Sequence, residues 1–362
     1  MNSSYPRIKI NLAKLRDNSN VITGLCARSG VDVAGVVKVC NSDIACVGVL
    51  ADSGCAQIAS SRLRHLEKIR EAGIDKPLML IRIPMLSEIS SLAEIADISL
   101  HSEIETLRLL DRESASLGKT NSVILMVELG DLREGLWGDD NLVSVATEVE
   151  KELPHLHLLG VGTNLGCYGS IEPTEEKLNE LVTKAELIEN SIGRKLEVIS
   201  GGGSTSLPRI LDGDMPPRIN HLRIGEAIML NDLGELYNYE IPGTHRDAFR
   251  LYAEIIEVSK KPSYPIGEIA YDAYGNKLEY IDLGERTRVL LAIGKADYAY
   301  PEKLIPITKG ISILGASSDH TILDVEDAQV EFKVGDIIEF DLNYGSLLLA
   351  MSSADMQFEY IE

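Results

Sequence analysis

The sequence predicts an α/β protein: a (β/α)8 TIM barrel followed by a mostly antiparallel C-terminal β domain. Short apolar runs alternate with amphipathic segments over about 200 residues, which is typical of a closed parallel barrel rather than an open sheet. After residue 236 the pattern changes to short β-rich segments separated by glycine, proline or charged turns. We expect the barrel to span residues 1–236 and the β domain residues 237–362, with the join near residues 238–245.

The apolar runs are continuous rather than alternating in polarity, as expected for strands buried on both faces. The predicted barrel strands are Val33–Val39, Ala56–Ala59, Leu78–Ile81, Asp97–Leu100, Val123–Leu129, Leu158–Thr163, Leu196–Ser200 and Asn220–Gly225. The segments between them carry apolar residues at i, i+3 and i+4, the spacing of helices that cover a sheet. Helices are predicted at Ser61–Ala72, Ser102–Leu117, Asn141–Leu153 and Thr174–Ile192, with a leading helix at Leu12–Ser29.

The C-terminal region has the short segments of an antiparallel β domain. Its predicted strands are Arg250–Ser259, Tyr280–Asp282, Thr287–Ile293, Ile311–Leu314, Gln329–Phe332 and Ile337–Leu342.

Composition excludes several classes of partner. The formal charge of −21 argues against binding to nucleic acid or to anionic membranes. No apolar stretch is long enough to span a bilayer, and the N-terminus lacks the basic and apolar regions of a signal peptide. The 5 cysteines, without metal-type spacing, fit a reduced cytosolic protein. We therefore expect a cytoplasmic protein without a metal site.

Lys38 is the first candidate for chemistry, because it ends the apolar run at the start of the predicted barrel. Active sites of such barrels collect at the carboxyl ends of the strands. Desolvation there would lower the pKa of an ammonium group and free the amine for Schiff-base formation. The alternative is a lysine that extends from a strand end to water.

A glycine run follows the seventh predicted strand, at Gly201–Gly203, and continues into Ser204 and Thr205. Backbone amides can approach an anion closely at glycines, and barrels commonly bind phosphate at this position. A flexible turn would also explain the glycines. The location favours phosphate.

Two arginines also follow strand ends. Arg223 ends the eighth predicted strand, and Arg133 lies in a glycine-flanked loop after the fifth. Each guanidinium could bind an anion or a ring nitrogen. Alternatively, each could make a structural ion pair, in the case of Arg133 with Asp131 or Glu134.

A lysine beside a phosphate loop is the arrangement that pyridoxal 5'-phosphate (PLP) requires. The segments Val36–Lys38, Leu132–Gly135, Gly201–Gly203 and Arg223–Gly225 resemble, in that order, the fold type III PLP enzymes of the alanine/ornithine racemase family. The segments Ala292–Asp297 and Gly315–His320 resemble two signatures of that family's β domain. The resemblance covers nearly the whole chain and is strongest to the ornithine racemase branch.

The resemblance implies roles for individual residues. Lys38 would hold PLP as a Schiff base and act as one catalytic base, and Arg223 would donate to the pyridine nitrogen. Arg133 would lie near the phenolic oxygen of PLP and the substrate carboxylate. Further cofactor contacts would come from Ser42, Gly202, Gly203, Ser204, Thr205 and Gly225.

The chain departs from alanine racemases at several positions. Lys295 replaces the tyrosine that serves as second base, so either Lys295 or the nearby Tyr298 is the candidate, with Asp319 beside it. Asn164 replaces the histidine that stacks on the cofactor ring. Met126 occupies the position of a carbamylated lysine, so that modification should be absent.

These features predict a PLP-dependent amino-acid racemase, an isomerase, with ornithine as the substrate that the resemblance implies. The alternatives are racemisation of alanine, lysine or another amino acid, PLP-dependent decarboxylation of a basic amino acid, D-threonine-type aldol cleavage, and non-catalytic PLP binding. The resemblance also implies a homodimer in which each active site is shared between the subunits.

Overall fold

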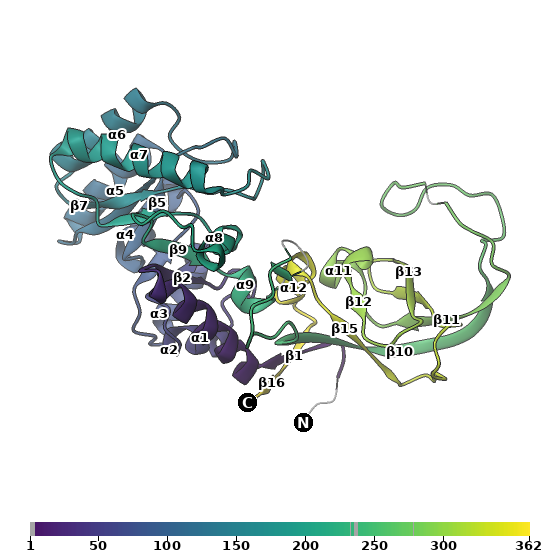
Figure 1. Cartoon of the computed structure of the whole chain (residues 1–362). Helices are drawn as coiled ribbons and strands as arrows, with labels where there is room; N and C mark the ends of the chain where they lie inside the picture. The colour runs from purple at the N-terminus through teal and green to yellow at the C-terminus, as the bar shows by residue number, and fades with distance from the viewer. Residues whose placement is uncertain (1–3, 232, 235–237, 278) are drawn as a thin grey trace. The chain divides into compact units, whose positions relative to one another are not determined.

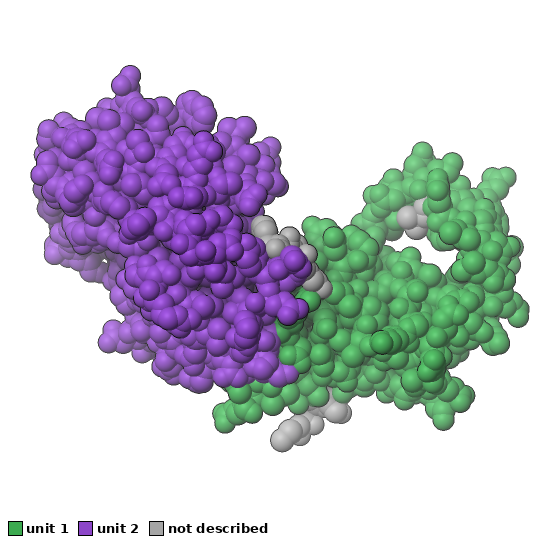
Figure 2. Space-filling view, viewed as in Figure 1, with its two compact units in different colours: residues 1–13, 246–362 green, residues 14–245 purple. Residues whose placement is uncertain are grey.

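The computed structural model describes residues 4–231, 233–234, 238–277 and 279–362. It divides into two compact units, residues 14–245 and residues 1–13 with 246–362 (Figures 1 and 2). The predicted boundary at 236/237 lies outside the described residues. Among the described residues, no helix combines the length and apolar character that crossing a bilayer requires.

The unit of residues 14–245 is a closed barrel of eight parallel strands, β2 to β9, as the alternating pattern predicted. The strands are β2 (Asp32–Val36), β3 (Gln57–Ser60), β4 (Leu78–Leu80), β5 (Ile98–His101), β6 (Asn121–Met126), β7 (Leu156–Gly162), β8 (Val198–Ser200) and β9 (His221–Ile224). The pairing of β2 with β9 closes the barrel and sets Ala34 opposite Arg223. The carboxyl ends of β2 and β9 are therefore neighbours.

Helices precede, connect and follow the barrel strands (Figure 1). They are α1 (Leu12–Arg28), α2 (Ile44–Asp52), α3 (Leu63–Glu71), η1 (Leu86–Glu88), α4 (Ile89–Ile95), α5 (Ile104–Ser116), α6 (Asp139–Glu152), α7 (Glu175–Ile192), η2 (Ser204–Ser206), α8 (Leu207–Asp212) and α9 (Glu226–Met229). Helix α7 illustrates why a helix begins and ends close to the residues predicted from the sequence. The Thr174 hydroxyl accepts a hydrogen bond from the Lys177 amide, and Gly193 ends the helix in the left-handed conformation.

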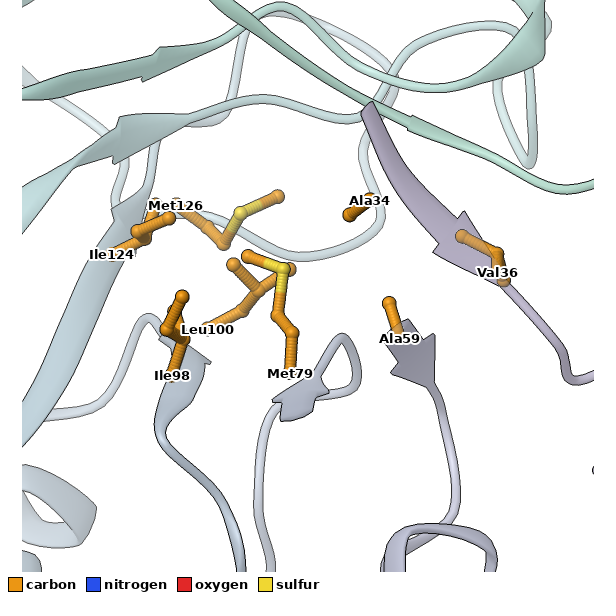
Figure 3. Close-up of a cluster of buried hydrophobic side chains, with 8 residues drawn as sticks. All are labelled: Ala34, Val36, Ala59, Met79, Ile98, Leu100, Ile124 and Met126. Atoms are coloured by element: carbon orange, nitrogen blue, oxygen red, sulfur yellow. The ribbon is translucent and has the colours of Figure 1, made fainter. Parts of the chain in front are cut away.

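The barrel interior is packed with side chains rather than open. Figure 3 shows apolar side chains from β2 to β6 pointing toward one another. They are Ala34, Val36, Ala59, Met79, Ile98, Leu100, Ile124 and Met126. Met126 is fully buried in this cluster, so a thioether fills the position where the family resemblance had placed a charged lysine.

The second unit is built on a sheet with the strand order β12-β15-β10-β11-β14-β13, in which β1 also pairs with β10 and β16 pairs with β1. The strands are β1 (Arg7–Asn11), β10 (Phe249–Pro262), β11 (Glu285–Leu291), β12 (Ile305–Pro306), β13 (Ser312–Ala316), β14 (Thr321–Asp324), β15 (Ile337–Asp341) and β16 (Gln357–Ile361). Its helices are α11 (Lys295–Tyr298), η3 (Pro301–Lys303) and α12 (Tyr344–Ala350). Most pairs are antiparallel, as predicted, but β1 pairs with β16 in parallel.

Two predicted strands are wrong. Residues 280–282 lie in an exposed segment, where the Asp282 carboxylate accepts the Gly284 amide and makes a turn. Residues 329–332 form bends and irregular backbone, because β-propensity alone does not make a strand. Residues 7–11, expected with the barrel, form β1 in the sheet of the second unit, where they pair with β10 and β16.

Candidate active site

Lys38 lies in a tight turn directly after β2. The Val37 amide still donates to Ala59 O of the neighbouring strand at 2.9 Å, and the Asn41 amide donates back to Lys38 O at 3.1 Å. The Lys38 side chain is half-buried. The structure therefore places this amine at the carboxyl end of a barrel strand, where the sequence predicted it.

Ser42 closes the same turn. It is fully buried and has a left-handed φ of 48°, which is uncommon for a residue with a side chain. Its amide donates to Val37 O at 3.0 Å, and its hydroxyl donates to Asn41 O at 2.8 Å. The next residue, Asp43, caps α2 by accepting the Cys46 amide. The turn that carries Lys38 is thus held at both ends.

Three glycines, Gly202 and Gly203 after β8 and Gly225 after β9, form a cradle with little room for side chains. Gly202 has φ +109°, and a Cβ there would lie 2.8 Å from the Ser206 hydroxyl oxygen. A Cβ on Gly225 would lie 2.9 Å from Val36 O of β2. A Cβ on Gly203 would lie 3.2 Å from Arg223 O. Because these three residues carry no side chains, an anion can approach their backbone closely.

Ser204 and Thr205, the two hydroxyl residues of this loop, differ in whether their hydroxyl hydrogen is already donated within the protein. Ser204 Oγ accepts the Ala227 amide of α9 at 3.2 Å, so its own hydrogen remains available to a ligand. Thr205 donates its hydroxyl hydrogen to Leu165 O at 3.0 Å. Of the two predicted contacts, Ser204 is therefore the better phosphate donor.

Arg223 is buried at the end of β9, and two hydrogen bonds orient its guanidinium. One nitrogen donates to Ser200 Oγ at 2.7 Å and the other to Thr163 O at 2.8 Å. Burial lowers the pKa of Arg223 to about 10; the Glu134 carboxylate opposes this shift and the Arg133 charge adds to it. Arg223 thus remains a cation at neutral pH, and further N–H donors can still face a ligand.

Sequence reasoning missed the residues that support Arg223. Ser200 Oγ accepts from Arg223, so its hydrogen can be donated to His221 Nδ1, which lies at 2.9 Å. The other ring nitrogen, Nε2, then donates to Gln57 Oε1 at 3.3 Å. Burial, and then the charge of Arg223, lowers the pKa of His221 to about 3, so its ring is neutral at pH 7. The sequence could have indicated this contact, because His221 is two residues before Arg223 and its side chain therefore lies on the same face of the strand.

Arg133 follows β6 and is partly exposed. Its guanidinium forms a two-point ion pair with Glu134, one of the partners considered from the sequence, and a third nitrogen donates to Cys167 Sγ at 3.0 Å. Asp131, the other partner considered, is buried and instead accepts amides of a neighbouring loop, including that of Tyr168 at 3.1 Å. Ion pairing and ligand contact are compatible, since a guanidinium has five N–H donors.

Asn164 lies next to Thr163, whose carbonyl orients Arg223. Its side-chain nitrogen Nδ2 is buried and has no hydrogen-bond partner. A buried donor without a partner is unfavourable, so such an atom marks a place where a ligand can supply the missing acceptor.

The second unit brings the remaining candidates together at the start of α11. The Lys295 amide donates to Ser317 O at 2.8 Å and the Ala296 amide to Ser318 O at 3.0 Å, which joins α11 to the loop that carries Asp319. Asp319 is exposed and accepts the Ser318 hydroxyl. Lys295 is half-buried, with its Nζ over the ring of Tyr274.

Tyr298 is enclosed. It is 0% exposed, and its hydroxyl lies 2.5 Å from Thr321 Oγ1. Thr321 donates its only hydroxyl hydrogen to Ile293 O at 2.7 Å, so the Tyr298 hydroxyl is the donor in this pair. Burial and the neighbouring carboxylates raise the pKa of Tyr298 to about 12. These contacts suit a core residue better than a base.

Comparisons with known proteins identify the family. Residues 10–231 match the family described as alanine racemase, N-terminal domain. The chain is 42% identical over 360 residues to ornithine racemase of Acetoanaerobium sticklandii, covering 99% of both chains. It is 36% identical over 357 residues to lysine racemase of Thermotoga maritima, covering 98% of both. The chain belongs to the alanine racemase family.

The fold is that of the family as well. Alanine racemase of Clostridium difficile 630 aligns with a TM-score of 0.75 and 19% identity over 100% of this chain and 97% of that chain. The predicted fold class, family, enzyme class and cofactor are thus confirmed, since alanine racemases depend on PLP.

The residues of the barrel unit fit PLP. A lysine amine, a buried arginine cation and a glycine cradle with the free hydrogen of Ser204 match the aldehyde, the ring nitrogen and the phosphate of the cofactor. The unpartnered Asn164 Nδ2 adds a donor that a cofactor oxygen could satisfy. Lys38, Arg223, Ser204 and Asn164 are therefore the residues best suited to hold it.

Proposed function

We propose that this protein interconverts L- and D-ornithine, with Lys38 and Lys295 as its two bases. The observation that carries the proposal is the pairing of β2 with β9, which brings the Lys38 turn and the buried Arg223 cation to one end of the barrel beside the glycine cradle. The 42% identity to ornithine racemase over nearly the whole chain supports ornithine. The 36% identity to lysine racemase supports lysine as a second substrate.

PLP, when bound, supplies an electron-withdrawing ring that weakens the Cα–H bond of the attached amino acid. Lys38 Nζ would take the Cα proton from one face, and the ammonium of Lys295 would return a proton to the other; the reverse reaction exchanges these roles. Arg223 would donate to the ring nitrogen and keep its own proton at neutral pH. By keeping its proton, Arg223 would leave the ring nitrogen unprotonated, and this would favour racemisation over other reactions of the cofactor.

Arg133 would bind the substrate carboxylate. The Glu134 ion pair and the Cys167 contact hold its guanidinium in place, and this support favours a fixed two-point contact with a carboxylate. Asp319, exposed in the loop that accepts the Lys295 and Ala296 amides, would contribute a nearby negative charge.

A homodimer in the cytoplasm is the remaining part of the proposal. In it the β unit of one subunit would supply Lys295 to the barrel of the other. Mixing Lys38→Ala and Lys295→Ala subunits tests this arrangement, because each heterodimer would have one intact site. A fully exchanged equal mixture of inactive variants should then recover about a quarter of wild-type activity. No recovery after verified subunit exchange would contradict a shared site.

The central test is a panel of ornithine, lysine, alanine and serine incubated with PLP-loaded protein in deuterated water and analysed by chiral chromatography. Racemisation predicts that D-ornithine appears with deuterium at Cα and that the highest kcat/KM belongs to ornithine. Carbon dioxide release would indicate decarboxylation instead. If no amino acid is converted while the visible PLP band is present, the protein is a PLP carrier.

A further inference from the structure

Tyr274 lies against the candidate second base within the β unit. Lys295 Nζ is 3.9 Å from the centre of the Tyr274 ring, well within the range of a cation–π interaction. Tyr274 belongs to the long segment that joins β10 to β11 (Figure 1). Tyr274 was not among the candidate site residues predicted from the sequence. No catalytic role considered above uses it.

A compact turn fixes the position of Tyr274. The Asp272 carboxylate accepts the amides of Tyr274 at 2.9 Å and Asn276 at 2.7 Å, and the Asp272 amide donates to Asn276 O at 2.8 Å. The Gly275 amide also donates to Asp272 O at 3.0 Å. The turn is therefore closed by its own hydrogen bonds and presents the ring in a defined direction, although Tyr274 is 49% exposed.

The backbone of Lys295 is equally constrained. Gly294, which precedes it, has no room for a side chain, because a Cβ would lie 2.1 Å from Ser318 O. The amides of Lys295 and Ala296 are held by the same loop. Four rotatable bonds nevertheless separate the Lys295 backbone from Nζ, so the fixed backbone alone does not aim the amine.

We propose that Tyr274 is a positioning residue that aims Lys295 through the face of its ring. The inference rests on the proposed function, in which Lys295 exchanges a proton with Cα. The ammonium form of Lys295 donates that proton and is left as the neutral amine. The negative ring face attracts the ammonium form, so it holds the amine in one place when the proton is ready for transfer.

The test uses the PLP-loaded enzyme with three single substitutions. Tyr274→Phe keeps the ring and removes the hydroxyl, and Tyr274→Leu removes the ring. Tyr271→Leu is the matched control, since Tyr271 is in the same segment and is 74% exposed, whereas the ring beneath Lys295 Nζ is that of Tyr274. Two readouts are compared: the racemisation rate of ornithine, and the rate at which acetic anhydride acylates Lys295, followed by peptide mass spectrometry with the other lysines as references.

Acetic anhydride reacts with the neutral amine, so loss of the ring should speed acylation of Lys295 by about two- to fivefold in Tyr274→Leu. The same variant should lose about tenfold in kcat with KM within about twofold, because positioning affects proton transfer and not substrate binding. Tyr274→Phe and Tyr271→Leu should behave like the wild type in both assays.

Unchanged acylation in Tyr274→Leu would overturn the inference, whatever happens to kcat. A loss of kcat in Tyr274→Phe as large as in Tyr274→Leu would also overturn it, because the hydroxyl rather than the ring face would then matter. The acylation assay does not depend on turnover. A wild-type protein that fails to racemise ornithine would therefore refute the proposed function while the Tyr274–Lys295 contact is still tested.

Discussion

Replacing Tyr298 with phenylalanine removes a hydroxyl that the structure encloses. The Tyr298 pKa of about 12 means that about one molecule in ten thousand carries the phenolate at pH 8, equivalent to about 5 kcal/mol against its use as a base. Its hydrogen is donated to Thr321 Oγ1, which turns the hydroxyl inward. We therefore expect Tyr298→Phe to keep kcat for ornithine within about twofold and to lose about 1 kcal/mol of unfolding free energy with the hydrogen bond.

Lys295→Met is the matched comparison, since it keeps an unbranched four-atom stem and removes the amine. A positioned acid or base contributes about 100- to 10,000-fold, so this variant should lose a factor in that range from kcat. The assay is chiral chromatography of ornithine started from each enantiomer, with circular dichroism as a control for folding. A folded Tyr298→Phe protein with kcat reduced a hundredfold or more, or a fully active Lys295→Met protein, would refute the assignment of Lys295 as the second base.

Three further outcomes are expected. Lys38→Ala should lack the visible absorbance of PLP bound to a lysine, and borohydride should then fix no cofactor to the chain. Ser200→Ala should leave a nitrogen of buried Arg223 without its acceptor and lower the unfolding free energy by about 1–3 kcal/mol, read from urea denaturation. Burial lowers the pKa of His101 to about 3. Below about pH 6.5 His101 is therefore protonated in the unfolded chain and neutral in the folded protein, so the unfolding free energy decreases as the pH is lowered. Between pH 7 and 5 the contribution of His101 should be about 2 kcal/mol, so the wild type should lose about that much more stability than His101→Gln in parallel urea titrations, because buried His221 contributes equally to both proteins.

The sequence by itself determined the barrel and much of the candidate active site. Apolar periodicity is a property of neighbouring residues, so the barrel strands and the main helices were predictable without any tertiary contact. Parallel strands of one barrel end on the same side. Residues that follow different strands, such as Lys38, Gly202 and Arg223, could therefore be expected at one end although they are far apart in the chain.

Tertiary structure decided what depends on partners distant in sequence. Strand β1 joins the C-terminal sheet because β10 and β16 pair with it. The local sequence of β1 does not indicate which distant strands will be its partners. The proposal of Lys295 rather than Tyr298 as second base rests on the burial of Tyr298 and its Thr321 contact, and Arg223 is held by Ser200, which in turn contacts His221. Local sequence specifies which backbone conformations are favourable. The partners of a polar side chain are set only when folding removes water and brings distant segments together.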